Sequence, residues 1–298
     1  MSAAWAAVVV NYEAGDALTN CVRSLRADDS AGAPPEIVVV DNGSRDGSVA
    51  RVGREFPDVE IVDLRTNRGY AAAANRGTAH TTAPIVAVCN ADIVVTRGAG
   101  AAMLAAFDDT AVGAAGPCIR NLDGSVYPSA RRDPGVVDAT GHAVFGLVWP
   151  RNPFTRRYRE LDADPSCARD VDWASGAALW LRRAAIDAIG GWDEGYFMYL
   201  EDVDVGWRLR SAGWRVRYEP AAELTHVGGL STRRHPTRMI VVHHRSAYRF
   251  ASKRWRGPRR LLLVPMATLL AVRAASIVLF TAARERLRPR RGGRNVTR

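Results

Sequence analysis

Carboxylates gather in one short stretch of this chain, residues 190–213, which reads GGWDEGYFMYLEDVDVGWRLRSAG. The acids in it are Asp193, Glu194, Glu201, Asp202 and Asp204. Aromatic residues stand among these acids, and glycines break the chain just upstream of them. A carboxylate beside an aromatic wall can act as a general base whose pKa is tuned by its surroundings. This stretch is therefore the first candidate for catalysis.

A structural role explains the same acids equally well at this stage. Leu200, Val203 and Trp207 recur at helical spacing, which predicts a helix that begins near Glu201. Acidic residues in the first turn of a helix stabilise the positive end of its dipole. The stretch alone leaves both interpretations open, and the elements that would position it must decide between them.

The first ninety residues alternate between apolar runs and helical patterns. Apolar, β-branched runs at 6–12, 37–40, 59–64 and 84–89 predict strands, and helical patterns follow at 17–26 and in the alanine-rich segment after Tyr70. This alternation is typical of a parallel α/β sheet, in which ligands bind at the carboxyl ends of the strands. Asn11, Asp41, Asn67 and Asp92 fall at those ends.

Each strand-end acid has a second interpretation. Asp41 suits a ribose or base hydroxyl, but it could equally cap its loop through Ser44 or Gly43. Asp92 follows a buried strand and leaves room for a hard cation, but an isolated aspartate in a turn is usually a turn former. The chain contains neither GxGxxG nor GxxxxGK[ST], so the classical dinucleotide and P-loop sites lose their main support.

The second half of the body begins irregularly. Residues 118–154 are rich in Gly, Pro, Arg and aromatics, which predicts functional loops; Arg131, Arg132 and Arg151 there could meet phosphate or simply be solvated. Strands are predicted at 173–182 and 214–218, and His226 is expected in a loop.

Charge and hydropathy set the end of the chain apart. Of the net charge of +10, residues 251–298 contribute +12, with 13 basic residues against Glu285, so residues 1–250 sum to −2. A nearly neutral body argues against nucleic acid as a partner. The apolar run 261–283 is about long enough to span a bilayer, but Arg273 at its centre favours a segment lying in the anionic interface. The alternative is a helix packed on the body or on a second subunit of a homodimer.

Two further features indicate the compartment. The cysteines (Cys21, Cys89, Cys118 and Cys167) form no CxxC pair, which fits a reduced, cytosolic setting. The N-terminus lacks a basic segment before its apolar run, so that run is expected to be a strand and not a signal peptide.

Taken in order, these motifs resemble the inverting family 2 glycosyltransferases of the GT-A fold. The matching segments are VVVNY at 8–12, VDNGSRDGS at 40–48, NRGYAAAANRG at 67–77, NAD at 90–92, the acidic stretch at 191–213 and HVGG at 226–229. The resemblance implies a Rossmann-like, mostly parallel sheet flanked by helices over 1–231, with a nucleotide-sugar half at about 1–116 and an acceptor half at about 117–231. Residues 232–298 would form a helical, basic, membrane-associating region.

The resemblance also implies roles for individual residues. Asp202 would be the general base and Glu201 would hold it or touch the acceptor. Contacts with the nucleotide sugar would come from Asn11, Tyr12, Asp41, Asn42, Asn67, Arg68, Gly69, Asn75, Asn90, Ala91 and Asp92. Contacts with the acceptor would come from Trp149, Arg151, Trp173, Gly176 and Tyr199.

A divalent metal, Mn²⁺ or Mg²⁺, is implied as cofactor, with Asp92 and His226 as its protein ligands. Many relatives carry an acid where Asn90 stands, so the usual DxD pattern is reduced to NAD and Asp92 would carry most of the charge. A histidine ligand mildly favours Mn²⁺ over Mg²⁺.

The segments DGSVYPSAR at 123–131 and HAVFGLVWPRNPF at 142–154 are similar to those of actinobacterial rhamnosyltransferases of this family. The implied substrates are dTDP-L-rhamnose and a polyprenyl-diphospho-N-acetylglucosamine of the arabinogalactan–peptidoglycan linker. The implied location is the cytoplasmic face of the plasma membrane, as a peripheral protein. Two alternatives remain open: another nucleotide sugar or acceptor, and a non-catalytic sugar-nucleotide-binding scaffold. A nucleotidyltransferase would need a lysine in a glycine-rich loop, and the only lysine is Lys253.

Overall fold

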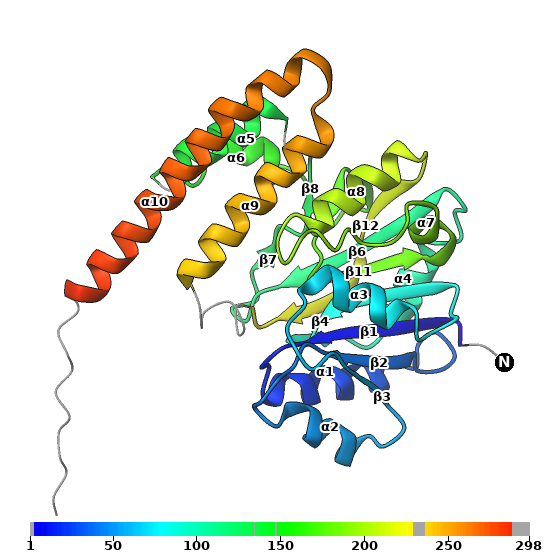
Figure 1. Ribbon diagram of the computed structural model, residues 1–298. Coiled ribbons are helices and arrows are strands. Elements are labelled where there is room, and N and C mark those ends of the chain that lie inside the picture. The colour runs from blue at the N-terminus through cyan, green and yellow to red at the C-terminus, as the bar shows by residue number, and fades with distance from the viewer. Residues whose placement is uncertain (1–2, 134, 147, 229–235, 288–298) are drawn as a thin grey trace, which may run out of the picture. The chain divides into compact units, whose positions relative to one another are not determined.

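A computed structural model describes residues 3–133, 135–146, 148–228 and 236–287 (Figure 1). The chain divides into two units, residues 1–231 and residues 232–298. Some sequence-based predictions lie outside the described residues: Gly229 of the HVGG motif, the predicted domain boundary at residue 231, and residues 288–298 of the basic segment.

A mixed sheet forms the centre of the first unit (Figure 1). Its main path runs in the order β3 (Glu60–Asp63), β2 (Glu36–Asp41), β1 (Trp5–Asn11), β4 (Ile85–Asn90), β11 (Ala178–Arg182), β6 (Val112–Arg120), β12 (Arg215–His226) and β5 (Ile93–Val95). Strand β7 (Val126–Tyr127) pairs with β6, and β9 (Arg169–Val171) pairs with β12. Strands β8 (Ala130–Arg131) and β10 (Trp173–Ala174) form a separate two-stranded sheet.

Alternation along the strands builds two cores, one on each face of the sheet. In β1, Ala7 and Val9 belong to one core, and Val8 and Val10 belong to the other. The first core is covered by α1 (Asp16–Ala27), α2 (Ser48–Glu55) and α4 (Ala99–Ala105). The second is covered by α3 (Tyr70–Thr78), α7 (Arg183–Ala188) and α8 (Glu201–Ser211). Apolar side chains on both faces explain why the first strands read as continuous apolar runs.

The predicted parallel sheet is confirmed for its first half. Strands β3, β2, β1 and β4 are mutually parallel, so their carboxyl ends lie along one edge. Strand β11 then enters antiparallel to both β4 and β6, which makes the whole sheet mixed. Tertiary pairing decides this direction, because a buried strand has the same apolar pattern either way.

The segment 118–154 is more regular than predicted. Strand β6 continues to Arg120, β7 and β8 follow, and helices α5 (Val136–Phe145) and α6 (Pro153–Tyr158) come next. Asn152 caps α6, because its side-chain oxygen accepts a hydrogen bond from the Thr155 N–H at 2.9 Å. The expectation of a long loop here was wrong because short elements carry little periodicity.

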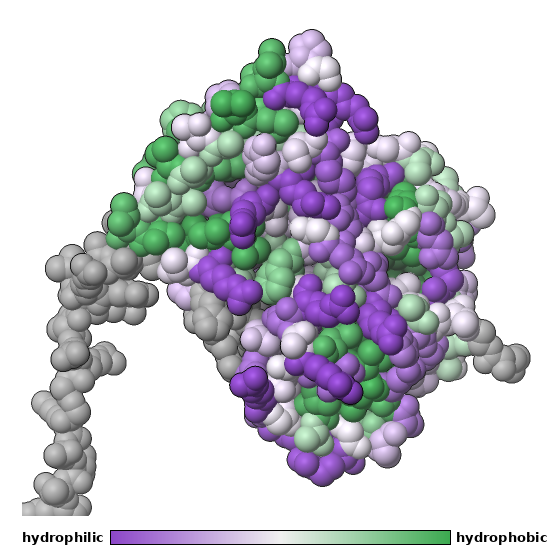
Figure 2. Space-filling model, in the orientation of Figure 1, coloured by the Kyte–Doolittle hydropathy of each residue, from purple (hydrophilic) through white to green (hydrophobic). Residues whose placement is uncertain are grey.

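The second unit is a helical hairpin of α9 (Pro236–Arg254), the 3₁₀ turn η2 (Gly257–Leu262) and α10 (Leu263–Leu287). The stretch Gly257–Leu279 is long and apolar enough to cross a membrane by length and composition, with a mean hydropathy of 2.1. Figure 2 shows apolar residues along α10, and Leu261, Val264 and Leu279 are strongly exposed. Arg273 lies 3.0 Å from the His244 ring through its Nη1, so α9 supplies a polar partner for the charge inside this apolar helix.

Candidate active site

The carboxyl ends of β1 and β2 hold a buried polar cluster. Asn11 and Asp41 pair across the two strands, and the Asn11 Nδ2 donates to Asp41 Oδ1 at 2.8 Å. Asp41 also accepts from the Ser44 N–H at 2.9 Å and from the Ser44 hydroxyl at 2.5 Å. Asp41 therefore caps its loop through Ser44, which is the structural alternative considered for it. Tyr12 follows directly at the same edge and is partly exposed.

Asn42 and Asn67 shape the loop that precedes α3. Asn42 donates to the Gly69 carbonyl at 3.3 Å and accepts from the Arg68 N–H at 3.2 Å, while Asn67 accepts from the Gly69 N–H at 3.0 Å. The predicted nucleotide-sugar residues at 42 and 67–69 are thus brought together.

Glycine is required at position 69. Its φ of 92° is in the left-handed region, and a Cβ there would lie 2.5 Å from the Phe197 carbonyl oxygen. The Tyr70 N–H donates to that same oxygen at 2.9 Å. The backbone at Gly69 therefore approaches the backbone of the loop before α8 so closely that a side chain does not fit between them.

Asn75 forms hydrogen bonds with the loop before α8. It lies on α3, where its side chain donates to the Trp192 carbonyl at 2.9 Å and to Glu194 at 3.0 Å and accepts from the Trp192 N–H at 2.8 Å. The amide that was expected to contact the nucleotide sugar instead joins α3 to the loop before α8.

Asp92 and His226 meet at the edge where β4 and β12 end. His226 is the last residue of β12 and not part of a loop, and its neighbour across the pairing is Ile93 of β5. Its Nε2 lies 3.0 Å from Asp92 Oδ1 and 3.2 Å from Asn90 Nδ2, and Ala91 is buried between the two strand-end residues. Asp92 Oδ2 accepts from the Gly228 N–H at 3.1 Å.

This arrangement fits a cation shared with a substrate. Among the described residues, no three or more His, Cys, Asp or Glu side chains form a group that could hold a metal ion. A carboxylate and an imidazole at contact distance are suitable ligands for a divalent ion whose remaining positions are filled by phosphate oxygens and water.

A strained turn at Tyr199 and Leu200 immediately precedes α8 and orients its first residues. Tyr199 and Leu200 have φ values of 68° and 64°, which are costly for residues with side chains. Helix α8 then begins at Glu201, as the sequence predicted. Two consecutive left-handed residues reverse the chain so that Glu201 and Asp202 enter the helix in fixed orientations.

Asp202 is partly exposed and is held by backbone donors. Its Oδ2 accepts from the Gly176 N–H and its Oδ1 from the Val203 N–H, both at 2.9 Å. Burial raises the pKa of Asp202, while the Gly176 N–H, the charge of Arg131 and the Val203 N–H oppose that rise. These three favour the ionised carboxylate, which is the form a general base needs.

Glu201 is in a different environment. It is 7% exposed, and its Oε2 is buried and has no hydrogen-bond partner among the residues that the structure describes. Burial and then the charge of Asp202 raise the pKa of Glu201 well above its ordinary range. The two adjacent carboxylates therefore have different surroundings: backbone N–H groups and Arg131 favour the charge of Asp202, whereas burial and the charge of Asp202 disfavour the charge of Glu201.

The turn at residues 175–177 contacts Ser129, Asp202 and Asn90 through three successive backbone groups. The sequence predicted one strand over 173–182, but this turn separates β10 from β11. The Ser175 N–H donates to the Ser129 carbonyl at 2.8 Å, the Gly176 N–H donates to Asp202, and the Ala177 carbonyl accepts from the Asn90 N–H at 2.9 Å. Through this turn, Asp202 is linked on one side to Asn90 at the end of β4 and on the other to Ser129, next to β8.

The predicted acceptor residues have varied positions. Gly176 contacts Asp202 directly, and Tyr199 immediately precedes α8 in the strained turn. Trp173 is buried, with its indole N–H donating to the Arg132 carbonyl at 2.9 Å, so it is a packing residue rather than an open sugar platform. Trp149 and Arg151 are exposed between α5 and α6.

Two site residues carry no role in the sequence-based assignment. Tyr70 is buried and donates to the Gly176 carbonyl at 2.6 Å, so it fixes the turn that binds Asp202. Arg131 was expected either to meet phosphate or to be solvated; its guanidinium lies 4.9 Å from the centre of the Trp173 ring and faces two tyrosines. The dipeptides Gly69-Tyr70 and Ala130-Arg131 lie in the quoted motifs, but only the fold shows what they contact.

Comparison with known proteins places this geometry in context. Residues 6–187 match the family model described as glycosyl transferase family 2. Over 272 residues the chain is 40% identical to the N-acetylglucosaminyl-diphospho-decaprenol L-rhamnosyltransferase of Mycobacterium tuberculosis, covering 86% of this chain and 88% of that protein.

Solved structures show the same fold at low sequence identity. The mannosyltransferase PcManGT of Pyrobaculum calidifontis, in complex with GDP-Man and Mn²⁺, superposes with a TM-score of 0.58 at 17% identity, covering 97% of this chain and 82% of that one. A structure of GalNAc-T7 with UDP, GalNAc and Mn²⁺ also gives 0.58, at 16% identity, over 76% of this chain and 44% of that one. The predicted GT-A fold is confirmed.

Proposed function

The chain belongs to glycosyl transferase family 2, and on that premise we propose that it transfers L-rhamnose from dTDP-L-rhamnose to a polyprenyl-diphospho-N-acetylglucosamine, with inversion at the anomeric carbon. One observation carries the choice of substrates. The 40% identity to the mycobacterial rhamnosyltransferase extends over 272 residues, well past the end of the family model at residue 187. It therefore includes α8 and residues beyond the nucleotide-sugar half, where acceptor specificity would be determined.

Asp202 is the general base of the proposed reaction. Its carboxylate removes the proton from the acceptor hydroxyl as that oxygen attacks the anomeric carbon of rhamnose. The carbon–oxygen bond to the diphosphate breaks on the opposite face, and the electron pair leaves with dTDP. A diphosphate leaving group needs no protonating acid, so one ionised carboxylate suffices.

Asp92 and His226 are the proposed protein ligands of a divalent ion. When bound, that ion balances the negative charge that grows on the diphosphate. The 3.0 Å approach of the two side chains supports this assignment, and the imidazole favours Mn²⁺. The loops at residues 42 and 67–69 would position the rest of the nucleotide sugar.

The second unit is proposed to hold the enzyme at the cytoplasmic face of the plasma membrane, where a polyprenyl-linked acceptor resides. Its apolar helix α10 and the exposed arginines of η2, Arg259 and Arg260, suit an anionic interface. Each arginine near such a surface contributes about 1 kcal/mol. Replacing both by glutamine in the full chain should weaken sedimentation with anionic liposomes about 30-fold and leave binding to zwitterionic liposomes unchanged. Equal binding to both vesicle types by the unmodified chain would contradict the interfacial role.

The function is tested by transfer of radiolabelled rhamnose from dTDP-rhamnose to a short polyprenyl-diphospho-N-acetylglucosamine. We expect transfer with Mn²⁺ and none with chelator, and no transfer from UDP-glucose or GDP-mannose. Tight binding of dTDP-rhamnose without transfer would indicate another acceptor or a scaffold. Absence of dTDP-rhamnose binding would reject the donor.

A further inference from the structure

Within the part of the chain that the structure describes, Arg131, whose charge acts on the base, and its neighbour Arg159 have no carboxylate at contact distance. Among the described residues, neither Arg131 nor Arg159 takes part in an ion pair, although four arginines lie around this part of the fold. Glu160 is shared by Arg132 and Arg169, at 3.2 Å from each. The charge of Arg131 acts on the Asp202 carboxylate without a contact ion pair, and Arg159 has no carboxylate partner at contact distance within the described residues.

Arg131 is held rigidly. Its guanidinium faces the rings of Tyr127, Tyr158 and Trp173 at 5.4, 5.8 and 4.9 Å. Its Nε donates to the Pro128 carbonyl at 2.8 Å and its Nη2 to the Tyr127 hydroxyl at 2.7 Å. A tyrosine hydroxyl that accepts from Arg131 still has its own proton to donate.

Arg159 is close enough to Arg131 to feel its charge. Burial and then the charge of Arg131 lower the pKa of the Arg159 guanidinium. Its Nε is buried and has no hydrogen-bond partner within the part of the chain that the structure describes. The repulsion between the two guanidinium groups and the unpaired Nε of Arg159 both cost free energy, and an anion bound beside them would offset that cost.

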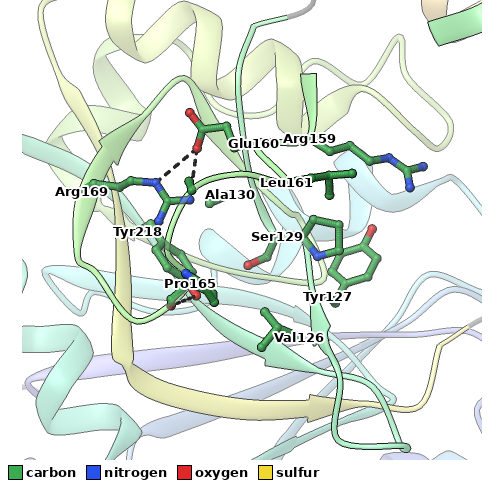
Figure 3. A pocket seen from close by; sticks show the side chains of 12 residues that line it. Val126, Tyr127, Ser129, Ala130, Arg159, Glu160, Leu161, Pro165, Arg169 and Tyr218 are labelled. Atoms are coloured by element: carbon green, nitrogen blue, oxygen red, sulfur yellow. Dashed lines mark hydrogen bonds and ion pairs between the residues drawn. The ribbon is translucent and has the colours of Figure 1, made fainter. Parts of the chain in front are cut away.

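A pocket of about 160 Å³ is lined by Arg159 and Tyr127, among others, whereas Arg131 is not one of its lining residues. Figure 3 shows Arg159 and Tyr127 at one end of it, and Glu160 joined to Arg169 at the other. The pocket is large enough for a phosphate-sized group in contact with the free donors of Arg159.

The position of the two arginines distinguishes between the two diphosphates of the reaction. The donor diphosphate belongs at the Asp92 edge, next to Ala177 of the 175–177 turn, whereas Arg131 lies at the Ser175 end of that turn, with Gly176, whose N–H donates to Asp202, between them. An acceptor sugar whose hydroxyl contacts Asp202 would extend away from the donor. We propose that Arg159 binds the diphosphate that links this sugar to its lipid, with the nearby charge of Arg131 adding to the attraction, an assignment that rests on the proposed function for the identity of the substrate.

The test compares Arg159→Met with Arg157→Met in the full-length enzyme. Arg157 is an exposed arginine two residues away that is already paired with Asp138. Loss of a charge-assisted contact in Arg159→Met should raise KM for the diphosphate-linked acceptor about 10- to 100-fold, without changing KM for dTDP-rhamnose or kcat. Arg157→Met should resemble the unmodified enzyme, and Arg159→Lys should recover part of the loss.

A neutral alkyl N-acetylglucosaminide separates phosphate binding from a structural effect. Because it lacks the diphosphate, the unmodified enzyme and Arg159→Met should use it equally well. An equal loss with both acceptors, or an unchanged KM for the diphosphate-linked one, would overturn the proposal.

Calorimetry with farnesyl diphosphate in the presence of chelator tests the anion site without any transfer. Binding that depends on Arg159 would support the site even if rhamnose transfer failed, in which case the proposed function alone would be wrong. Transfer by the unmodified enzyme together with farnesyl diphosphate binding that ignores Arg159 would reject the site and leave the function intact.

Discussion

Replacing Asp202 by asparagine should remove catalysis without removing the fold or the donor site. Asparagine keeps an oxygen that can accept from the Gly176 or the Val203 N–H, but it cannot take a proton at neutral pH. Loss of a general base lowers kcat about 10²- to 10⁴-fold, which corresponds to about 3 to 5 kcal/mol of activation free energy. Burial penalises the carboxylate at this position, so the loss of one charge-assisted hydrogen bond is offset and the free energy of unfolding should change little.

Asp204 provides a matched control on the same helix. It is fully buried and pairs with Arg208, its Oδ2 lying 2.6 Å from the Arg208 Nε. Asp204→Asn leaves Arg208 without its partner, which should cost about 3 to 5 kcal/mol of stability. Because Asp204 points into the core beside Tyr196 rather than toward Gly176, kcat of the folded protein should be retained.

The assay is radiolabelled rhamnose transfer together with dTDP-rhamnose binding and urea unfolding for each protein. We expect opposite patterns: Asp202→Asn stable and inactive, Asp204→Asn unstable and active. The pH dependence gives a second measure, because activity should fall as pH drops through the raised pKa of Asp202. Removing the charge of Arg131 with Arg131→Gln raises that pKa further and moves the acid limb to higher pH. A kcat within tenfold of the unmodified value for Asp202→Asn would refute its role as base.

Three further predictions concern the surroundings of the base. Gly69→Ala should lower the free energy of unfolding by about 2 to 5 kcal/mol, because of its left-handed backbone and the contact with Phe197. Gly98→Ala, with φ 98° and open space around it, should lower the free energy of unfolding by only about 1 to 2 kcal/mol, and equal losses in urea unfolding would contradict the close approach at Gly69. Glu201→Gln should raise Tm at pH 8 but not at pH 4. A carboxyl whose pKa is higher in the folded state than in the unfolded state destabilises the protein only at pH values above the unfolded-state pKa. Equal Tm values for the variant and the unmodified protein at pH 8 would refute a penalty for burying this carboxyl. His226→Ala should weaken Mn²⁺ binding in the presence of dTDP, measured by the EPR signal of free Mn²⁺, and an unchanged signal would remove it from the metal site.

The sequence determined the local elements and the edge at which chemistry occurs. Apolar runs of the right length predicted β1, β2 and β4, because strands buried on both faces read as continuous apolar runs, and a run at 59–64 predicted the more exposed strand β3. Since parallel strands end at one edge, the polar residues that follow them had to lie together, and the pairing of Asn11 with Asp41 confirms this. The start of α8 at Glu201 was also readable from helical spacing.

The tertiary structure decided which of these residues can act. Asp92 and His226 are 134 positions apart in sequence and meet only because β12 pairs with β5. Glu201 and Asp202 are neighbours of the same residue class, yet a helix turns about 100° per residue. Glu201 therefore buries an oxygen that has no hydrogen-bond partner in the described part of the chain, whereas Asp202 accepts from the Gly176 N–H.

The same limit explains why the sequence did not show the contacts of individual site residues. The side chain of Asn75 forms hydrogen bonds with the backbone of Trp192, and the indole N–H of Trp173 donates to the Arg132 carbonyl. The sequence left Arg131 as either a phosphate contact or a solvated arginine, and the fold places its guanidinium over the Trp173 ring and near Arg159. A side chain's chemistry depends on its hydrogen-bond partners and its burial, and both are set by contacts between segments that are distant in the sequence.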